Sequence, residues 1–295
     1  MRIEMKFGDM ELFLIEDGGF RLDGGGMFGV VPRAMWAKSD PPDEQNRIAL
    51  NCNCLLVKTG DANVLIDTGC GGKWSDKEAA MFAIDKPRTL ISDLERAGMK
   101  KEDITHVIHT HLHFDHAGGG TYIDNDGQLK TQFPNATYFA QRGEWEVANN
   151  PNSRDRRSYK PENLNPLTES GQLQFIDGDQ EVLPGISVRV TGGHTKHHQV
   201  IFVKSGAHTA VYNGDLIPLV SHLPVPFVMA YDLYPLQTMT YKQSHLDEAA
   251  ANDYLMIFEH SPFQNLKAGH LKINDRGRHD LVPVNLDDDE YSPSE

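Results

Sequence analysis

The run from His111 to His116, with the sequence HLHFDH, places three imidazoles and one carboxylate within six residues. Burying so many polar side chains without partners would cost free energy. Neutral imidazole and carboxylate groups are good ligands for zinc-like cations. Gly118-Gly119-Gly120 follows directly and lets the backbone turn tightly and approach the site. The run therefore predicts a metal-binding loop.

Three later groups offer further ligands, although each alone is a weak signal. His194 follows two glycines, and His197 and His198 close behind it could equally be surface or hydrogen-bonding histidines. Asp215 follows Gly214 in what could be an ordinary turn. His260 comes directly after an apolar run, where a single histidine is usually structural. Only a fold that brings these groups to the run could make them one site.

The elements around these groups indicate a layered α/β protein. Apolar and β-branched runs predict strands over 10–15, 50–58, 63–67, 104–109, 137–140, 186–190, 199–204, 210–212 and 254–258. Helical spacing predicts helices over 89–97, 142–148 and 238–251. Residues 23–32 are expected to form a glycine-rich loop, and 149–168 a surface loop. The polar groups fall at strand ends, so the site should lie along one edge of the sheets.

Length and charge limit the organisation and the partners. A chain of 295 residues with 39% hydrophobic residues can form one domain, predicted over 1–286, with an acidic, flexible tail over 287–295. The net charge of −14 argues against nucleic acid as a partner. The one short basic stretch, Arg154 to Arg157 around Asp155, has the composition of an ordinary solvated loop.

Cysteine usage and hydropathy predict a cytoplasmic protein that does not enter a membrane. Three cysteines do not suit a disulfide scaffold, and neither a secretory signal nor a long apolar span is visible in the sequence. Cys52 and Cys54 would point to one face of a strand and are interpreted as core residues. Cys70 could lie near the site.

The ordered combination of these groups resembles the metallo-β-lactamase superfamily, whose signature is HxHxDH, then Gly-His, then an aspartate, then a late histidine. The matching residues are His111, His113, Asp115, His116, His194, Asp215 and His260. Residues 65–69, LIDTG, also look like the strand-turn marker of the family, in which Asp67 supports the ligand loop. The resemblance spans roughly residues 10–262 and implies a four-layer αβ/βα sandwich.

The resemblance also implies a binuclear hydrolase. His111, His113 and His194 would bind one metal, Asp115, His116 and His260 the other, and Asp215 would bridge them. The two ions would be divalent transition metals, with zinc favoured and manganese, iron or cobalt as alternatives. A hydroxide shared by the metals would attack the substrate, and Asp115 or Asp215 would move the proton. A non-catalytic metal-binding scaffold is the alternative class, but all seven ligands are present.

Other segments resemble YtnP-like quorum-quenching lactonases, which open N-acyl homoserine lactones. These segments are residues 23–32, 46–48, 214–218 and 228–235. The resemblance implies a small ester or lactone substrate and allows a homodimer formed through the N-terminal loop. An apolar wall for the acyl chain, or alternatively core packing, would be formed by Met27, Phe28, Val30 and Trp36.

Three departures from the lactonase pattern keep an alternative open. Thr-Gly-Gly-His replaces Thr-Pro-Gly-His, a serine follows His260, and Pro218 stands where a tyrosine is usual. Tyr231 or His222 could replace that tyrosine as a hydrogen-bond donor. The region from His260 to residue 271 also resembles methyl parathion hydrolase. Hydrolysis of organophosphate triesters is therefore the second interpretation.

Overall fold

Strand β3 (Arg47–Thr59) shows how this sequence builds layers, because successive side chains of a strand point to opposite faces. A computed structural model describes residues 5–262 and 267–284. In it, Leu55 and Val57 join a core that also contains strand residues of the second sheet. Cys54 and Leu56 instead pack with Leu94 of helix α4 (Leu90–Arg96). The strand is therefore buried on both faces.

The first sheet has seven strands and carries the N-terminal half of the site. Its order is β1 (Met5–Phe7), β2 (Met10–Asp23), β3, β4 (Ala62–Ile66), β5 (His106–Ile108), β8 (Thr137–Gln141) and β9 (Leu173–Ile176). Strands β4, β5, β8 and β9 pair in parallel, so their carboxyl ends share one edge. A separate hairpin joins β6 (Thr121–Ile123) and β7 (Leu129–Thr131).

The second sheet also has seven strands and packs against the first. Its order is β10 (Gln180–Leu183), β11 (Ile186–Val190), β12 (Gln199–Ser205), β13 (His208–Tyr212), β14 (Leu255–Ile257), β15 (Ala268–Ile273) and β16 (His279–Pro283). Strand β13 pairs in parallel with β14, which brings the segments after residues 212 and 257 together.

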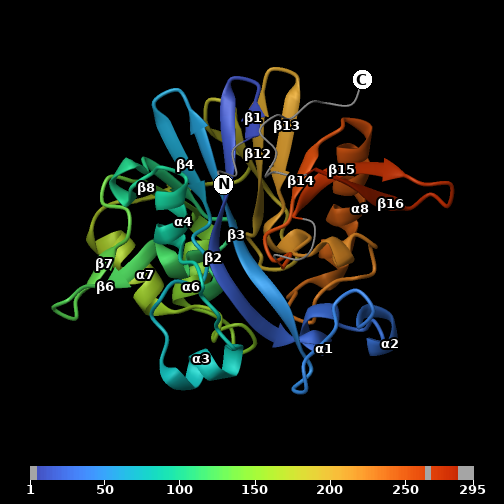
Figure 1. Ribbon diagram of the computed structural model, residues 1–295, viewed down its shortest axis with the longest axis horizontal. Coiled ribbons are helices and arrows are strands. Elements are labelled where there is room, and N and C mark those ends of the chain that lie inside the picture. The colour runs from blue at the N-terminus through green and yellow to red at the C-terminus, as the bar shows by residue number, and fades with distance from the viewer. Residues whose placement is uncertain (1–4, 263–266, 285–295) are drawn as a thin grey trace.

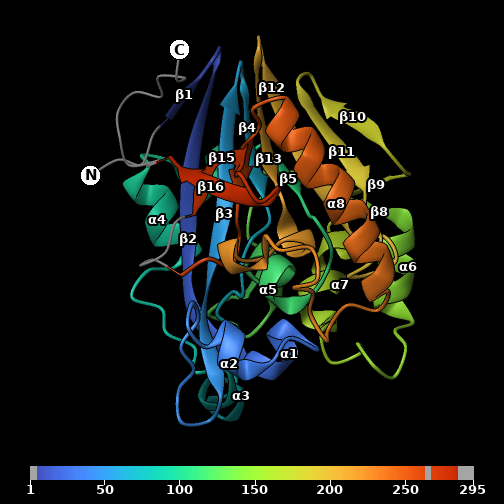
Figure 2. The ribbon, with the colours of Figure 1, turned by 90° about the vertical axis from the view of Figure 1, so that its right-hand side faces the viewer.

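Helices cover the outer faces of both sheets. Figure 1 shows α4, α6 (Arg142–Asn149) and α7 (Pro161–Glu169) on one side of the sheets and α8 (Pro235–Ala251) on the other. Figure 2 shows α8 lying across the second sheet. The short helices are α1 (Gly24–Phe28), α2 (Arg33–Trp36), α3 (Asp76–Phe82) and α5 (Phe114–Ala117). Helix, sheet, sheet and helix form the four layers, which confirms the predicted αβ/βα sandwich.

Two segments predicted as loops contain helices. Within 149–168, helix α7 begins at Pro161, because proline suits the first helical position, where its missing N–H costs nothing. Within 23–32, the Asp23 side chain accepts a hydrogen bond from Gly26 N and caps the short helix α1. The acidic segment 287–295 lies outside the described residues.

Within residues 5–262 and 267–284, no helix combines the length and the apolar character that crossing a membrane requires.

Candidate metal centre

The histidine run follows the carboxyl end of β5 and continues into α5, which contains Asp115 and His116. Asp67, which follows β4, fixes the start of this loop: its two carboxylate oxygens accept hydrogen bonds from Thr110 N (2.8 Å) and Thr110 Oγ1 (2.6 Å). The backbone at Gly119, just after the run, lies so close to the segment after β4 that a Cβ on Gly119 would be 2.1 Å from Thr68 O. Glycine is therefore required at that position, and the loop is held from both sides.

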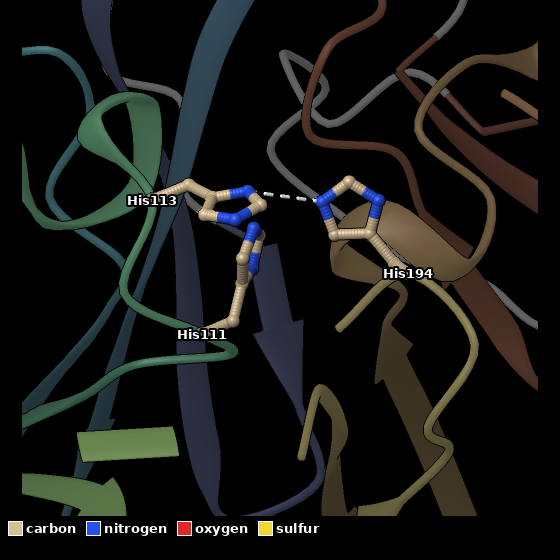
Figure 3. Close-up of side chains that lie close together, drawn as sticks. All are labelled: His111, His113 and His194. Atoms are coloured by element: carbon tan, nitrogen blue, oxygen red, sulfur yellow. Dashed lines mark hydrogen bonds between the residues drawn. The ribbon is translucent and has the colours of Figure 1, made fainter. Parts of the chain in front are cut away.

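The first cluster consists of His111, His113 and His194. Figure 3 shows the three imidazoles converging, with His194 reaching across from the loop between β11 and β12. The Nδ1 atom of His113 lies 3.1 Å from Nε2 of His194. All three side chains are buried, and their ligand atoms lie within 4.8 Å of one another. This spacing would allow one cation to contact all three nitrogens.

The second cluster consists of Asp115, His116 and His260, and its ligand atoms also lie within 4.8 Å of one another. His260 Nε2 is 3.3 Å from His116 Nε2 and 3.7 Å from Asp115 Oδ2. His260 reaches the cluster because it follows β14, whose carboxyl end lies at the same edge as that of β13. The cluster therefore joins residues 144 positions apart in the sequence.

Asp215 lies between the two clusters and turns one carboxylate oxygen toward each. Its Oδ2 is 3.0 Å from His194 Nε2, while its Oδ1 is 3.2 Å from His260 Nε2. The position is set by a tight turn after β13, in which Asp215 N donates a hydrogen bond to His198 Nε2 at 3.0 Å. This is the arrangement that a carboxylate bridging two cations needs.

The outer nitrogens of these histidines contact fixed acceptors. His194 Nδ1 lies 3.0 Å from Asp232 Oδ1, and His260 Nδ1 lies 2.8 Å from Asn51 O. His116 Nδ1 lies between two carboxylates, 3.0 Å from Asp67 and 2.9 Å from Glu259. Contacts of this kind orient the rings of metal-binding histidines and select their tautomer. Glu259 was not singled out in the sequence, and its position next to His260 was the only available signal.

Charges within the centre are strongly coupled. Burial lowers the pKa of His111 and His113 well below the usual value for histidine. Burial also opposes charging of His194, but the Asp215 and Asp232 carboxylates together outweigh it and raise the pKa of His194 to about 10. Burial raises the pKa of Glu259 to about 8, although the charge of His116 opposes the rise. A cation bound by His194 must displace the extra proton of this imidazole, so metal binding should release protons.

The residues fit a metal pair better than they fit an ordinary polar core. Among the described residues, His111 Nε2 and Asp215 Oδ1 are buried without a hydrogen-bond partner. A buried polar group left unpaired costs about 1–3 kcal/mol. Imidazole nitrogens and carboxylate oxygens are the donors that zinc, manganese, iron and cobalt share. Cations held by these atoms would satisfy both groups.

A cavity of about 480 Å³ opens beside the two clusters. Its polar wall includes His113, Asp115, His194, Asp215 and His260. Its apolar wall is formed by Leu22, Met27, Phe82, Phe114, Met229 and Ala230. Two of the six substrate-binding residues predicted from the sequence, Met27 and Tyr231, line this cavity.

The other four predicted substrate-binding residues lie elsewhere. Phe28 stacks between Trp36 and His222, with ring centroids 5.2 Å and 4.6 Å away, and all three are buried. His222 Nε2 bonds to the carbonyl oxygen of Met27 at 2.8 Å, which makes it a support for the cavity wall. Val30 is 93% exposed and does not belong to the cavity lining.

The basic stretch has a different position from the one its composition indicated. The composition predicted an ordinary solvated loop, but Arg154, Asp155 and Arg157 belong to the wall of the cavity. The loop reaches the site because Ser158 O accepts a hydrogen bond from Phe114 N at 2.8 Å. Such a contact between distant residues leaves no signal in a single sequence.

All three cysteines are buried with free thiols, which for Cys52 and Cys54 agrees with their interpretation as core residues. Cys52 and Cys70 touch, with their sulfur atoms 3.3 Å apart, and Cys52 lies beside Asp115 O behind the second cluster.

Comparison with known proteins places this geometry in a family. Residues 47–260 match the metallo-beta-lactamase superfamily. An N-acyl homoserine lactonase of Bacillus cereus is 29% identical over 171 residues, or 54% of this chain, and this match spans only 61% of the relative's length. The crystal structure of a probable metal-dependent hydrolase from Staphylococcus aureus is 33% identical, with a TM-score of 0.85 over 95% of this chain and 99% of that one.

The fold also matches AidC, a dizinc quorum-quenching lactonase solved with the product N-hexanoyl-L-homoserine. The TM-score is 0.77 at 24% identity, over 95% of this chain and 96% of that one. The matched segment 47–260 begins in β3, ends at His260, and contains the other five residues of the two clusters as well as Asp215. The chain therefore belongs to the metallo-β-lactamase superfamily.

Proposed function

We propose that this protein is a binuclear metal-dependent lactonase whose substrates are N-acyl homoserine lactones, which would make it a quorum-quenching enzyme. The observation that carries the proposal is the position of Asp215. Its two oxygens face different histidine clusters, 3.0 Å from His194 and 3.2 Å from His260, at the wall of a cavity. The similarity to N-acyl homoserine lactonases over half of the chain supports the substrate class.

In this proposal the seven clustered residues hold two divalent ions, with zinc favoured. His111, His113 and His194 would hold one ion, Asp115, His116 and His260 the other, and Asp215 both. When bound, such ions polarise an ester carbonyl and lower the pKa of water to about 7. The protein's part is to fix the ligand geometry and the apolar surroundings.

Asp115 and Asp215 would move the proton, since both carboxylates line the cavity. During ring opening, the oxygen of a water molecule bonds to the lactone carbonyl carbon, and the ring C–O bond breaks. The departing alkoxide oxygen needs a proton, and a carboxylate that has taken one from the water can return it. The product is a hydroxy acid.

In this proposal the acyl chain, which is the part of the substrate remote from the lactone ring, packs against the apolar wall of the cavity. Met27 and Phe114 place apolar surface beside His113 and Asp115, so a bound alkyl chain would leave water while its ester stays at the polar wall. Tyr231, 39% exposed at the cavity, is proposed to donate a hydrogen bond to the substrate. A cavity of about 480 Å³ falls in the usual range for small-molecule sites.

The test is a substrate panel with metal-loaded enzyme. N-acyl homoserine lactones with acyl chains of increasing length and paraoxon-like phosphotriesters are compared by kcat/KM. We expect lactone turnover to exceed triester turnover and to rise with chain length until the apolar wall is covered. Turnover of triesters alone would assign the protein to phosphotriester hydrolysis instead.

A further inference from the structure

Two arginines line the active-site cavity of this acidic protein. Arg154 and Arg157 belong to the cavity wall, together with His113 and Asp215. Both arginine side chains are exposed, whereas Arg156 between them lies outside the cavity lining. The net charge of the chain is −14, so positive charge at this opening is a local exception. It would attract anions to a protein that otherwise repels them.

Among the described residues neither cavity arginine forms an ion pair, although the charge of Arg154 acts on the neighbouring Asp155 carboxylate. Within the described part of the chain, no carboxylate lies within ion-pair distance of Arg154 or Arg157. Asp155, between them in sequence, is 6% exposed, and its carboxylate oxygens accept no hydrogen bond from either guanidinium. The guanidinium of Arg157 therefore stays available to a ligand.

The loop that carries these arginines is held against the metal centre. Phe114, between two of the clustered residues, bonds to Ser158 O, directly after Arg157. Arg154 donates a hydrogen bond to Ala230 O on the opposite wall of the cavity. These two contacts hold the loop near the cavity at both ends, so Arg157 faces the cavity from an anchored backbone.

We propose that Arg157 is a specificity-determining residue that binds an anionic group at the end of the substrate remote from the ring, with Arg154 adding to the positive potential. The inference rests on the proposed lactonase function and narrows it to lactones whose acyl chain ends in a carboxylate. A guanidinium matches a carboxylate with two parallel hydrogen bonds, which gives direction as well as charge complementarity.

The experiment compares two lactones of equal chain length with the metal-loaded enzyme: N-hexanoyl homoserine lactone and its adipoyl counterpart, which ends in a carboxylate. The variants are Arg157→Gln and the matched control Arg156→Gln, which removes the same charge outside the cavity lining. We expect Arg157→Gln to raise KM for the adipoyl lactone by about three- to tenfold. Neither variant should change KM for the hexanoyl lactone by more than about twofold.

Three outcomes separate the inference from the function on which it rests. Equal effects of Arg157→Gln and Arg156→Gln on the adipoyl lactone would overturn the inference and leave the lactonase proposal intact. If the wild-type enzyme opens neither lactone, the proposed function fails. Calorimetric binding of the adipoyl lactone to wild type and Arg157→Gln then decides the inference, because equal affinities would reject it.

Discussion

Asp232 Oδ1 lies 3.0 Å from Nδ1 of His194, and both side chains are buried. The carboxylate accepts a hydrogen bond from Nδ1–H, so the lone pair of Nε2 is directed at the first cluster. Asp232 therefore acts on the centre through His194. It comes from the loop before α8, far in sequence from the histidine run.

Replacing Asp232 with asparagine should weaken metal binding, because the amide can hold His194 in the wrong tautomer. Loss of such a partner typically costs about 10- to 100-fold in metal affinity, and we expect about tenfold here. Competition with a chromogenic chelator measures the change. Asp126→Asn, on an exposed hairpin turn, is the control and should bind metal as the wild type does. Equal affinity of both variants would contradict the positioning role.

Asp215→Ala should separate the two clusters, since each would lose the oxygen that faces it. We expect the metal content to fall from about two ions per chain and hydrolysis to fall by at least about a hundredfold, the upper range for loss of a supporting partner. Elemental analysis and initial rates check this together. Retained turnover with two ions per chain would mean that Asp215 does not bridge.

Metal removal should destabilise the protein, because the clustered histidines and carboxylates are buried and lack enough partners without a cation. An ion at a thousandfold excess over its Kd stabilises the folded state by about 4 kcal/mol. Thermal unfolding before and after dialysis against a chelator should therefore show a lower Tm, which added zinc restores. A Tm that neither the chelator nor added zinc changes would argue against the metal centre.

Lys242 should make stability depend on pH. Its side chain is fully buried and donates a hydrogen bond to Phe227 O at 2.7 Å. Burial lowers the pKa of Lys242 to about 7, although the charge of Asp232 opposes the shift. Between about pH 7 and the usual lysine pKa of about 10.4, the unfolded chain holds a proton that the folded chain has released. The free energy of unfolding should rise with pH across this window.

The matched test of this pH dependence uses Lys242→Met and Lys38→Met in metal-free protein. Lys38 is exposed, so Lys38→Met should keep the wild-type slope of the unfolding free energy against pH. One titrating group can contribute at most about 1.4 kcal/mol per pH unit to this slope. Lys242→Met should flatten the slope. Urea denaturation at pH 7, 8 and 9 distinguishes the two, and identical slopes would exclude Lys242 as the cause.

Gly24→Ala should destabilise the segment beneath the cavity, because a Cβ at Gly24 would lie 2.3 Å from Cη2 of Trp36. Such overpacking costs about 1–3 kcal/mol. Gly72→Ala is the control, since a Cβ there meets nothing within 4 Å and should change stability by less than about 0.5 kcal/mol. Equal unfolding free energies of the two variants would show that the stack can move aside.

The sequence by itself determined the family and most of the elements. The run from His111 to His116 is informative alone because four possible ligand residues fall within six positions, so a single loop can bring them together. Helix α4 was predicted as residues 89–97 and is observed as Leu90–Arg96, because its apolar spacing and the caps Thr89 and Gly98 are local signals. Helix α7 was missed, because prolines at its start and inside it have the composition of a loop.

Only the tertiary structure decided how the distant residues meet. Asp215 and His260 come together because β13 and β14 pair in parallel, a contact that local spacing does not encode. For the same reason, composition could not separate Met27, which lines the cavity, from Phe28, which lies in the core, or Arg157 from Arg156. Neighbours in sequence have almost the same local pattern. Which of them faces a cavity depends on the packing of segments far away in the chain.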